Sequence, residues 1–293
     1  MALAESPFVP SKKDTSDRVL LTKEILELKQ KKNAVILAHN YQTPEIQDIA
    51  DFTGDSLGLS LEATKTTADL VVFCGVYFMA ETAAMLSPEK QVLIPDKNAG
   101  CSLASSITAE QLRSWKSEHP NSVVVSYVNT TAAVKAESDY CCTSANAVKV
   151  IESIPEKYEI LFLPDMFLGT YIQKITGRKN ILVWWGECHV HAAIGSREIY
   201  KARSNHPKAE FLIHPECGCI TSAMYLTSEK DPSVANGRIL STGGMAKYVR
   251  ESQSTEFVVA TEEGMLHPLR RKNPRKTFYP VSDQSVCEFM KMI

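Results

Sequence analysis

The sequence has no apolar run of 18 residues, about the length that a membrane-spanning helix needs, so we expect no transmembrane helix. Residues 1–17 lack the apolar stretch of a secretory signal, and we interpret them as a flexible tail. Excess charge of one sign is missing too, because 32 Lys and Arg residues face 34 Asp and Glu residues, for a formal net charge of −2. We therefore expect neither a nucleic-acid nor a membrane partner.

The compact C-x2-C-x2-C run of ferredoxins is also absent, although the chain holds 8 cysteines. With no secretory signal, we expect a cytoplasmic protein whose thiols stay reduced. Cysteines in that compartment indicate metal, cluster or reactive-thiol sites more than disulfides. The dense positive cluster at residues 270–276 is interpreted as solvated surface, with an anion-attracting rim as the alternative.

A weak internal repeat recurs about every 90 residues. In each copy an apolar run (34–37, 122–125 and 210–213) leads into a polar turn (39–41, 127–129 and 214–216). A cysteine later follows a bulky pair at a similar distance: 22 residues from Met79 to Cys101, 20 from Leu168 to Cys188 and 21 from Leu266 to Cys287. A true repeat would bring these loops to one axis, whereas chance echoes in an α/β chain are the alternative.

Short apolar runs separated by helix-length amphipathic stretches, such as 22–32 and 108–116, predict βαβ units with parallel sheets. Cys74 lies in an apolar strand, and Cys141 and Cys142 adjoin an expected helix start, so we interpret all three as packing residues. Cys217 and Cys219 form a Cys-x-Cys pair that rivals the three spaced cysteines as a zinc or redox site.

Ten segments in order, from near residue 20 to the end, resemble quinolinate synthases. They are ILAHNYQ (36–42), DIADFTGDSLGLS (48–60), FCGVYFMAETAAMLSP (73–88), AGCSLA (99–104), YVNTTAAVKAESD (127–139), CTSANAV (142–148), WGECHVH (185–191), HPECG (214–218), STGGM (241–245) and TEEGMLH (261–267). Several of these segments are long and uncommon, so a chance match in this order is not expected.

The resemblance implies an α/β fold of three pseudo-symmetric, three-layer α/β/α (Rossmann-like) domains around a central cluster. We expect a first domain at 18–105 that also includes the C-terminal segment 275–293, a second at 106–192 and a third at 193–274. Residues 1–17 would form the tail.

The resemblance also implies one [4Fe-4S] cluster, whose ligands in the family fall on Cys101, Cys188 and Cys287. Some members carry C-x2-C-x2-C ending at the last ligand, but Val281 and Gln284 stand there in this chain, so no thiol switch is expected. Three ligands leave one iron of the cluster open, able to act as a Lewis acid and exposed to oxygen.

The family's reaction condenses iminoaspartate with dihydroxyacetone phosphate and releases phosphate and two waters as the pyridine ring of quinolinate closes. The implied activity is that of a transferase in NAD biosynthesis. A functional link to L-aspartate oxidase, which would supply iminoaspartate, is left open.

Working residues carry over from the family by position. The implied catalytic residues are Glu216, His39, Tyr41 and Tyr127, with the pKa of Glu216 tuned toward neutrality beside a low-dielectric pocket. The implied substrate-binding residues are His39, Ser56, Tyr127, Asn129, Ser144, His191, His214, Glu216, Ser241 and Thr242. For the hydroxyl residues simple helix capping is the alternative, and it is compatible with anion binding.

Two functions of other classes compete with this one. An iron–sulfur electron carrier or redox sensor would need four cysteine ligands or a reversible redox couple. A metal-free α/β protein that binds a phosphorylated ligand, with cysteines that are merely buried, would be colourless even when purified without oxygen.

Overall fold

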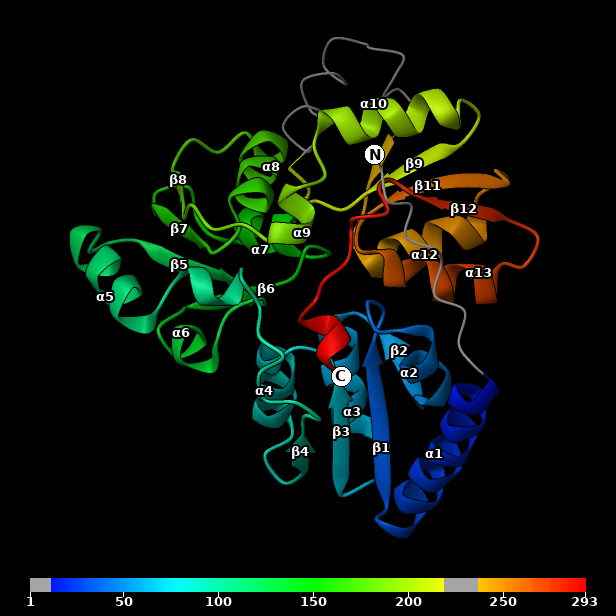
Figure 1. Cartoon of the computed structure of the whole chain (residues 1–293). Coiled ribbons are helices and arrows are strands. Elements are labelled where there is room, and N and C mark those ends of the chain that lie inside the picture. Colours follow the sequence, from blue (N-terminus) through cyan, green and yellow to red (C-terminus); the bar gives the residue numbers. More distant parts are fainter. Residues whose placement is uncertain (1–11, 219–236) are drawn as a thin grey trace, which may run out of the picture.

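The computed structural model describes residues 12–218 and 237–293, which contain three four-stranded sheets flanked by helices (Figure 1). The strand orders are β2-β1-β3-β4, β6-β5-β7-β8 and β10-β9-β11-β12, so each sheet repeats one order. Every pair of neighbouring strands runs parallel. The predicted α/β fold of three-layer α/β/α units, each built on a parallel sheet, is therefore confirmed.

The central strands are continuous apolar runs because helices cover both faces of a parallel sheet. The strand β1 (Ala34–His39) and the strand β7 (Ile160–Leu163) illustrate this, since five of six and four of four residues are buried. The first unit contains α1 (Lys12–Lys31), β1, α2 (Pro44–Ile49), β2 (Phe52–Gly54), α3 (Ser56–Lys65), β3 (Leu70–Cys74), α4 (Tyr77–Leu86) and β4 (Gln91–Leu93).

The second and third units repeat this alternation of helix and strand. The second contains η1 (Ala104–Ser106), α5 (Ala109–Glu118), β5 (Val123–Tyr127), α6 (Ala132–Ala136), β6 (Tyr140–Cys142), α7 (Ala147–Ser153), β7, α8 (Met166–Thr176) and β8 (Ile181–Val183). The third contains α9 (His189–Ala192), α10 (Ser196–Asn205), β9 (Glu210–Ile213), β10 (Gly237–Ile239), α12 (Thr242–Glu251), β11 (Glu256–Ala260), η2 (Glu263–Met265), α13 (Leu266–Lys272), β12 (Thr277–Pro280) and η3 (Met290–Met292).

One basic side chain performs the same task in each unit. Lys90, Arg178 and Lys276 each stand shortly before the last strand of their sheet. Each donates hydrogen bonds to the C-cap carbonyl of α3, α7 or α12, respectively, and to a second carbonyl nearby. The carbonyl groups that a helix end leaves unpaired are satisfied in this way. The three units thus share this helix-capping contact as well as a strand order.

Replacing Lys276 with methionine is expected to lower the free energy of unfolding of the metal-free protein by about 1–3 kcal/mol, the usual cost of losing hydrogen bonds from a charged group. The ammonium group donates to Val249 O and Ser252 O, both at 2.6 Å. Thermal or urea unfolding checks this value. An unchanged midpoint would show that the two bonds contribute nothing.

The hydrophobic cores join the units rather than separating them. One buried cluster includes Leu37 and Phe73 of the first sheet together with Leu212 and Phe257 of the third. Cys101 packs against this cluster and also against the core of the second unit. The first and third sheets are therefore held side by side, with the predicted cysteine ligand at their junction with the second.

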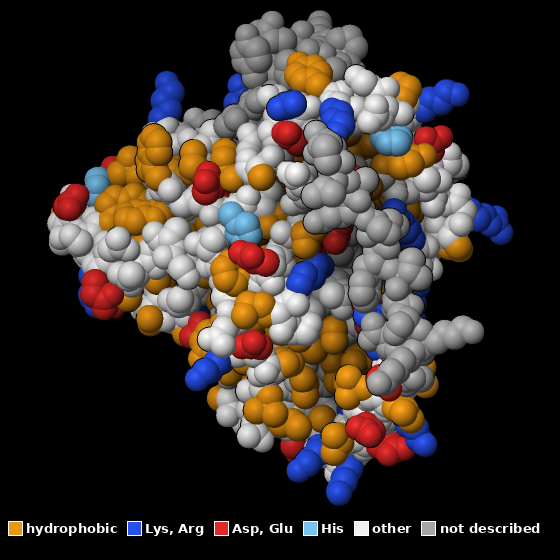
Figure 2. Space-filling model, viewed as in Figure 1, with side chains coloured by type: hydrophobic (Ala, Val, Ile, Leu, Met, Phe, Trp, Pro, Cys, Tyr) orange, Lys and Arg blue, Asp and Glu red, His pale blue; other side chains and the backbone are white. Residues whose placement is uncertain are grey.

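The domain boundaries predicted from the sequence remain predictions. In the described ranges 12–218 and 237–293, no helix is both long and apolar enough to cross a membrane. Figure 2 shows Lys and Arg side chains dispersed over the viewed face. Within the basic run at 270–276, Arg270 donates to Phe278 O, and Arg271 pairs with Asp48 at 2.7 Å on the surface.

Candidate active site

A single cavity lies where the carboxyl ends of the three sheets meet, and it is bordered by the loops that follow the strands. This is the edge at which parallel sheets bind ligands. Every site residue predicted from the sequence lines this cavity. They are His39, Tyr41, Ser56, Cys101, Tyr127, Asn129, Ser144, Cys188, His191, His214, Glu216, Ser241, Thr242 and Cys287. The roles assigned to them remain predictions.

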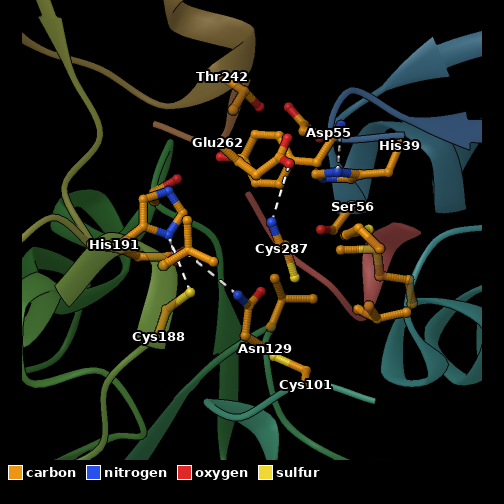
Figure 3. Close-up of a pocket in the computed structure, with 18 of the residues that line it drawn as sticks. His39, Asp55, Ser56, Cys101, Asn129, Cys188, His191, Thr242, Glu262 and Cys287 are labelled. Carbon is orange, nitrogen blue, oxygen red and sulfur yellow. Dashed lines mark hydrogen bonds and ion pairs between the residues drawn. The ribbon is translucent and has the colours of Figure 1, made fainter. Parts of the chain in front are cut away.

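Figure 3 shows the sulfur atoms of Cys101, Cys188 and Cys287 facing the same space. Residues next to these cysteines also touch one another. The hydroxyl of Ser102 lies 2.8 Å from Nδ1 of His189, and the His189 ring packs edge-on against Phe289 with centroids 5.8 Å apart. The three cysteine-bearing loops are therefore neighbours, and their thiols are free of disulfides.

The other described cysteines lie outside the cavity lining. Cys74 and Cys142 are buried, as predicted, but the interpretation of Cys141 as a packing residue is wrong, because it is exposed in the middle of the edge strand β6. Cys217 is buried and its thiol donates to Ala260 O at 3.2 Å. Its rival partner Cys219 lies outside the described residues.

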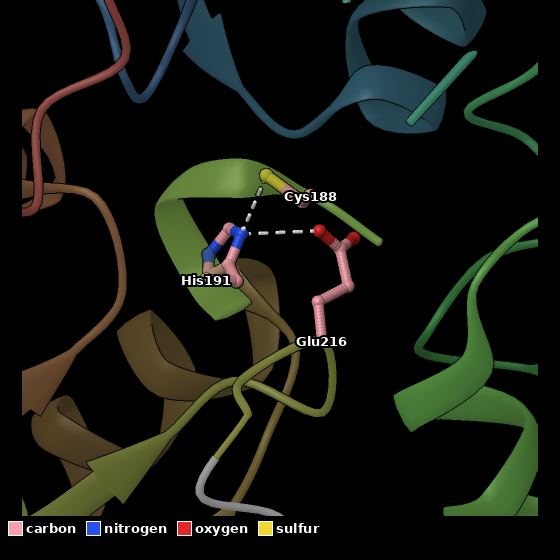
Figure 4. Close-up of side chains that lie close together, drawn as sticks. All are labelled: Cys188, His191 and Glu216. Carbon is pink, nitrogen blue, oxygen red and sulfur yellow. Dashed lines mark hydrogen bonds and ion pairs between the residues drawn. The ribbon is translucent and has the colours of Figure 1, made fainter. Parts of the chain in front are cut away.

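Glu216 is the centre of a buried polar network. It is only 3% exposed, and Oε1 accepts a short hydrogen bond from the hydroxyl of Tyr127. The other oxygen, Oε2, lies 3.2 Å from Nδ1 of His191, which is itself 3.3 Å from the sulfur of Cys188 (Figure 4). Asn129 reaches Oε1 at 3.5 Å. Cys188, His191 and Glu216 offer ligand atoms within 4.8 Å of one another, so a metal could also contact this group.

The expectation that the pKa of Glu216 approaches neutrality is wrong. Burial raises this pKa, but His214, His191 and the Tyr127 hydroxyl outweigh burial and lower the pKa of Glu216 to about 2. Burial also lowers the pKa of His214 to about 4, so that ring is neutral near pH 7. The positive charge opposite the carboxylate is that of His191: burial opposes protonation, but Cys188 and Glu216 raise its pKa to about 10. The pair is thus an ionised carboxylate and an imidazolium.

His39 and His214 adopt the same local arrangement at the ends of β1 and β9. In each case the ring nitrogen Nδ1 accepts a hydrogen bond from the backbone N–H two residues later, that of Tyr41 at 3.2 Å and that of Glu216 at 3.4 Å. Accepting at Nδ1 assigns the proton of each neutral ring to Nε2. Burial lowers the pKa of His39 to about 3. Both rings are therefore neutral at pH 7, with Nε2–H as the available donor.

The predicted hydroxyl residues lie where α3, α7 and α12 begin. Ser241 is the N-cap of α12, and its Oγ accepts from Gly244 N at 3.2 Å, so the capping alternative holds for this residue. Thr242 is the first residue of the same helix, and Ser56 is the first residue of α3 behind the N-cap Asp55. Because they also line the cavity, capping and ligand contact are compatible here.

Comparison with known proteins decides the family. A family model described as quinolinate synthetase A protein matches residues 23–293. This chain belongs to the quinolinate synthetase A family. A protein named quinolinate synthase from Mycobacterium sp. (strain KMS) is 57% identical over 270 residues, which cover 92% of this chain and 80% of that protein. A quinolinate synthase from Mycobacterium tuberculosis (strain H37Rv) is 56% identical over 270 residues, 92% of this chain and 77% of that protein.

The family resemblance inferred from the sequence is confirmed, and the chain is an enzyme of this family. A solved structure, the E-1-hydroxy-2-methyl-but-2-enyl-4-diphosphate reductase from Plasmodium falciparum, aligns with 93% of this chain and 80% of that one. Its 11% identity and TM-score of 0.33 carry no argument about this quinolinate synthetase A family member.

Two residues of the site were not predicted from the sequence, Thr261 and Glu262, although both lie in the family segment TEEGMLH. The hydroxyl of Thr261 lies 2.6 Å from the hydroxyl of Tyr41 and 2.9 Å from Nε2 of His191. It therefore links a side chain of the first unit to one beside Cys188. Glu262 follows it and lines the same cavity (Figure 3). No periodicity or spacing marks these contacts, because they join residues far apart in the chain.

Replacing Thr261 with valine is expected to lower kcat about tenfold or more, while Thr261→Ser stays near wild type. Valine has nearly the shape of threonine but leaves Tyr41 and His191 without their shared partner in a buried site, and about 1.4 kcal/mol of lost positioning equals a tenfold change in rate. Steady-state kinetics at several pH values, with thermal unfolding as the control, checks this. Equal kcat for the valine and serine variants would contradict it.

Proposed function

We propose that this enzyme is a quinolinate synthase, a transferase that condenses iminoaspartate with dihydroxyacetone phosphate to quinolinate, phosphate and two waters for NAD biosynthesis. The observation that carries the proposal is a single cavity lined by three thiols from separate loops and by a buried acid–base network. High identity to proteins named quinolinate synthase supports it. A cavity between the units, rather than an open surface, is the kind of site that small-molecule substrates use.

The residues present fit a [4Fe-4S] cluster. Cys101, Cys188 and Cys287 are free thiols on neighbouring loops, and thiolates are the ligands that such clusters take. These three residues would hold the cluster. When bound by three thiolates, it would supply an open iron that polarises a substrate oxygen as a Lewis acid.

The anionic groups of the substrates would meet hydroxyls and backbone N–H groups. Ser56, at the start of α3, and Thr242, at the start of α12, offer hydroxyls beside the positive ends of two ten-residue helices. The Ser144 hydroxyl and the Asn129 amide line the second unit's part of the cavity. Such groups would hold the phosphate and the carboxylates, and exclude water as the substrates fill the space.

Proton transfer would be the task of the Glu216 network. An ionised Glu216 can accept a proton from a substrate carbon or oxygen, and the Tyr127 hydroxyl, already directed at Oε1, can return one. The imidazolium of His191 holds its Nδ1 proton toward Oε2 and keeps the carboxylate charged. The neutral His39 would contact substrate through Nε2–H, with Tyr41 held in place by Thr261. L-aspartate oxidase is the proposed source of the unstable imine.

The test is an anaerobic preparation with iron and sulfide counted per chain, followed by an assay with dihydroxyacetone phosphate and freshly generated iminoaspartate. We expect iron and sulfide in the four-to-four proportion of the cluster, visible absorbance that changes when quinolinate is added, and formation of quinolinate. A protein that binds iron and shows a reversible redox couple but makes no product would favour the electron carrier. A protein that stays colourless after reconstitution would rule out the cluster assignment.

A further inference from the structure

Cys287 reaches the cavity by a different route from the other two thiols. After β12 the chain leaves the third sheet and returns to the first unit, where it ends (Figure 1). Met290, three residues later, is buried in the core that joins the first and third units. The segment around Cys287 contains only the short η3 helix, and apart from a backbone hydrogen bond from Glu263 N to Ser285 O at 2.9 Å its position depends on side-chain contacts.

Glu262, two residues beyond the end of β11, makes side-chain contacts with this segment. Its side chain is 1% exposed. One oxygen, Oε1, accepts from the backbone N–H of Cys287 at 3.2 Å, and Oε2 accepts from Gly264 N at 2.7 Å. A buried carboxylate that binds two backbone N–H groups is fixed in orientation, because each oxygen has its own donor. The backbone of Cys287 is thereby attached to the third unit.

Lys291 closes the other end of the same turn. Its backbone N–H donates to Cys287 O at 3.2 Å, and its ammonium group lies 2.9 Å from Oε1 of Glu262. The ammonium group also donates to Tyr41 O at 2.6 Å. A single carboxylate oxygen thus receives both the N–H of Cys287 and the side chain one turn later. The ion pair connects β11, the Cys287 turn and the Tyr41 loop of the first unit.

We propose that Glu262 and Lys291 are positioning residues that hold the Cys287 thiol toward the cavity, so that the third cluster ligand is in place before iron arrives. The inference rests on the proposed role of Cys287 as a ligand. A buried ion pair adds little net stability compared with well-packed apolar side chains, so stability alone does not explain the pair. The geometry of the pair does explain it, because the pair fixes a segment that contains neither a strand nor a long helix. Removing a contact of this kind beside a metal ligand commonly lowers metal affinity 10- to 100-fold.

The test compares Lys291→Met, Lys291→Arg and Glu262→Gln with the control Lys276→Met, which removes an ammonium group that binds two carbonyls outside the cavity lining. After anaerobic reconstitution, iron release to a chelator is timed. We expect release about tenfold faster or more from Lys291→Met and Glu262→Gln than from the control, and near wild type from Lys291→Arg. Release no faster than from the control would overturn the proposal.

A second measurement needs no metal. In the metal-free protein, the alkylation rate of each cysteine is followed by peptide mass spectrometry. Lys291→Met should speed labelling of Cys287 several-fold and leave Cys188 unchanged, with thermal unfolding shifted no more than in Lys276→Met. Unchanged labelling of Cys287 would overturn the positioning role. If wild type binds no iron but the labelling result holds, the cluster assignment fails and the positioning role stands.

Discussion

Cys287→Ser is expected to abolish iron–sulfur content and quinolinate formation while leaving the fold intact. Serine replaces one sulfur with a hydroxyl, which is a poor ligand for iron in such clusters, and only two thiols of the cavity remain. The side chain is only partly buried where it packs against the core, and serine has nearly the same size, so the exchange removes little packing. Iron and sulfide counts, the visible spectrum and the activity assay measure the effect.

Cys141→Ser is the matched control, since Cys141 is exposed and outside the cavity lining. It should keep wild-type iron and activity. Thermal unfolding of both variants without metal should agree within a few degrees. A Cys287→Ser protein with full iron and full activity would remove this residue from the ligand set.

Glu216→Gln is expected to keep iron and to lose activity by about 10²- to 10⁴-fold, the usual range for removal of a general acid–base group. Glutamine keeps the shape of the side chain but cannot accept and release a proton. It also takes away the negative charge that raises the pKa of His191, so that ring should lose its proton at a lower pH than in wild type. The pH dependence of kcat, together with iron counts, measures both effects.

Glu210→Gln serves as the control for this variant. Glu210 is a carboxylate of the same unit that accepts from the hydroxyls of Tyr248 and Ser254, away from the cavity. Its exchange should leave kcat near wild type. Loss of iron in Glu216→Gln would show that Glu216 belongs to the metal site formed with Cys188 and His191 rather than to the acid–base machinery.

The errors of the sequence interpretation share one cause. Glu216 was expected to have a pKa near neutrality because a carboxyl in an apolar pocket resists ionisation. In the structure, His214 two residues earlier, together with His191 and Tyr127 at 25 and 89 residues away along the chain, lowers the pKa of that carboxyl by more than burial raises it. Cys141 was expected to pack, but strand order places β6 at a sheet edge. Partners and neighbours across the chain decided both outcomes.

The sequence by itself determined the parallel α/β units and the family, and it identified residues that prove to line one cavity. Continuous apolar runs specify buried parallel strands, and the spacing of Cys101, Cys188 and Cys287 repeats with those units. Only the tertiary structure revealed Thr261 bonded to Tyr41 220 residues away and Lys291 bonded to the Tyr41 carbonyl 250 residues away. Hydrogen bonds and ion pairs depend on distances of a few ångströms between folded segments, and no local pattern encodes those distances.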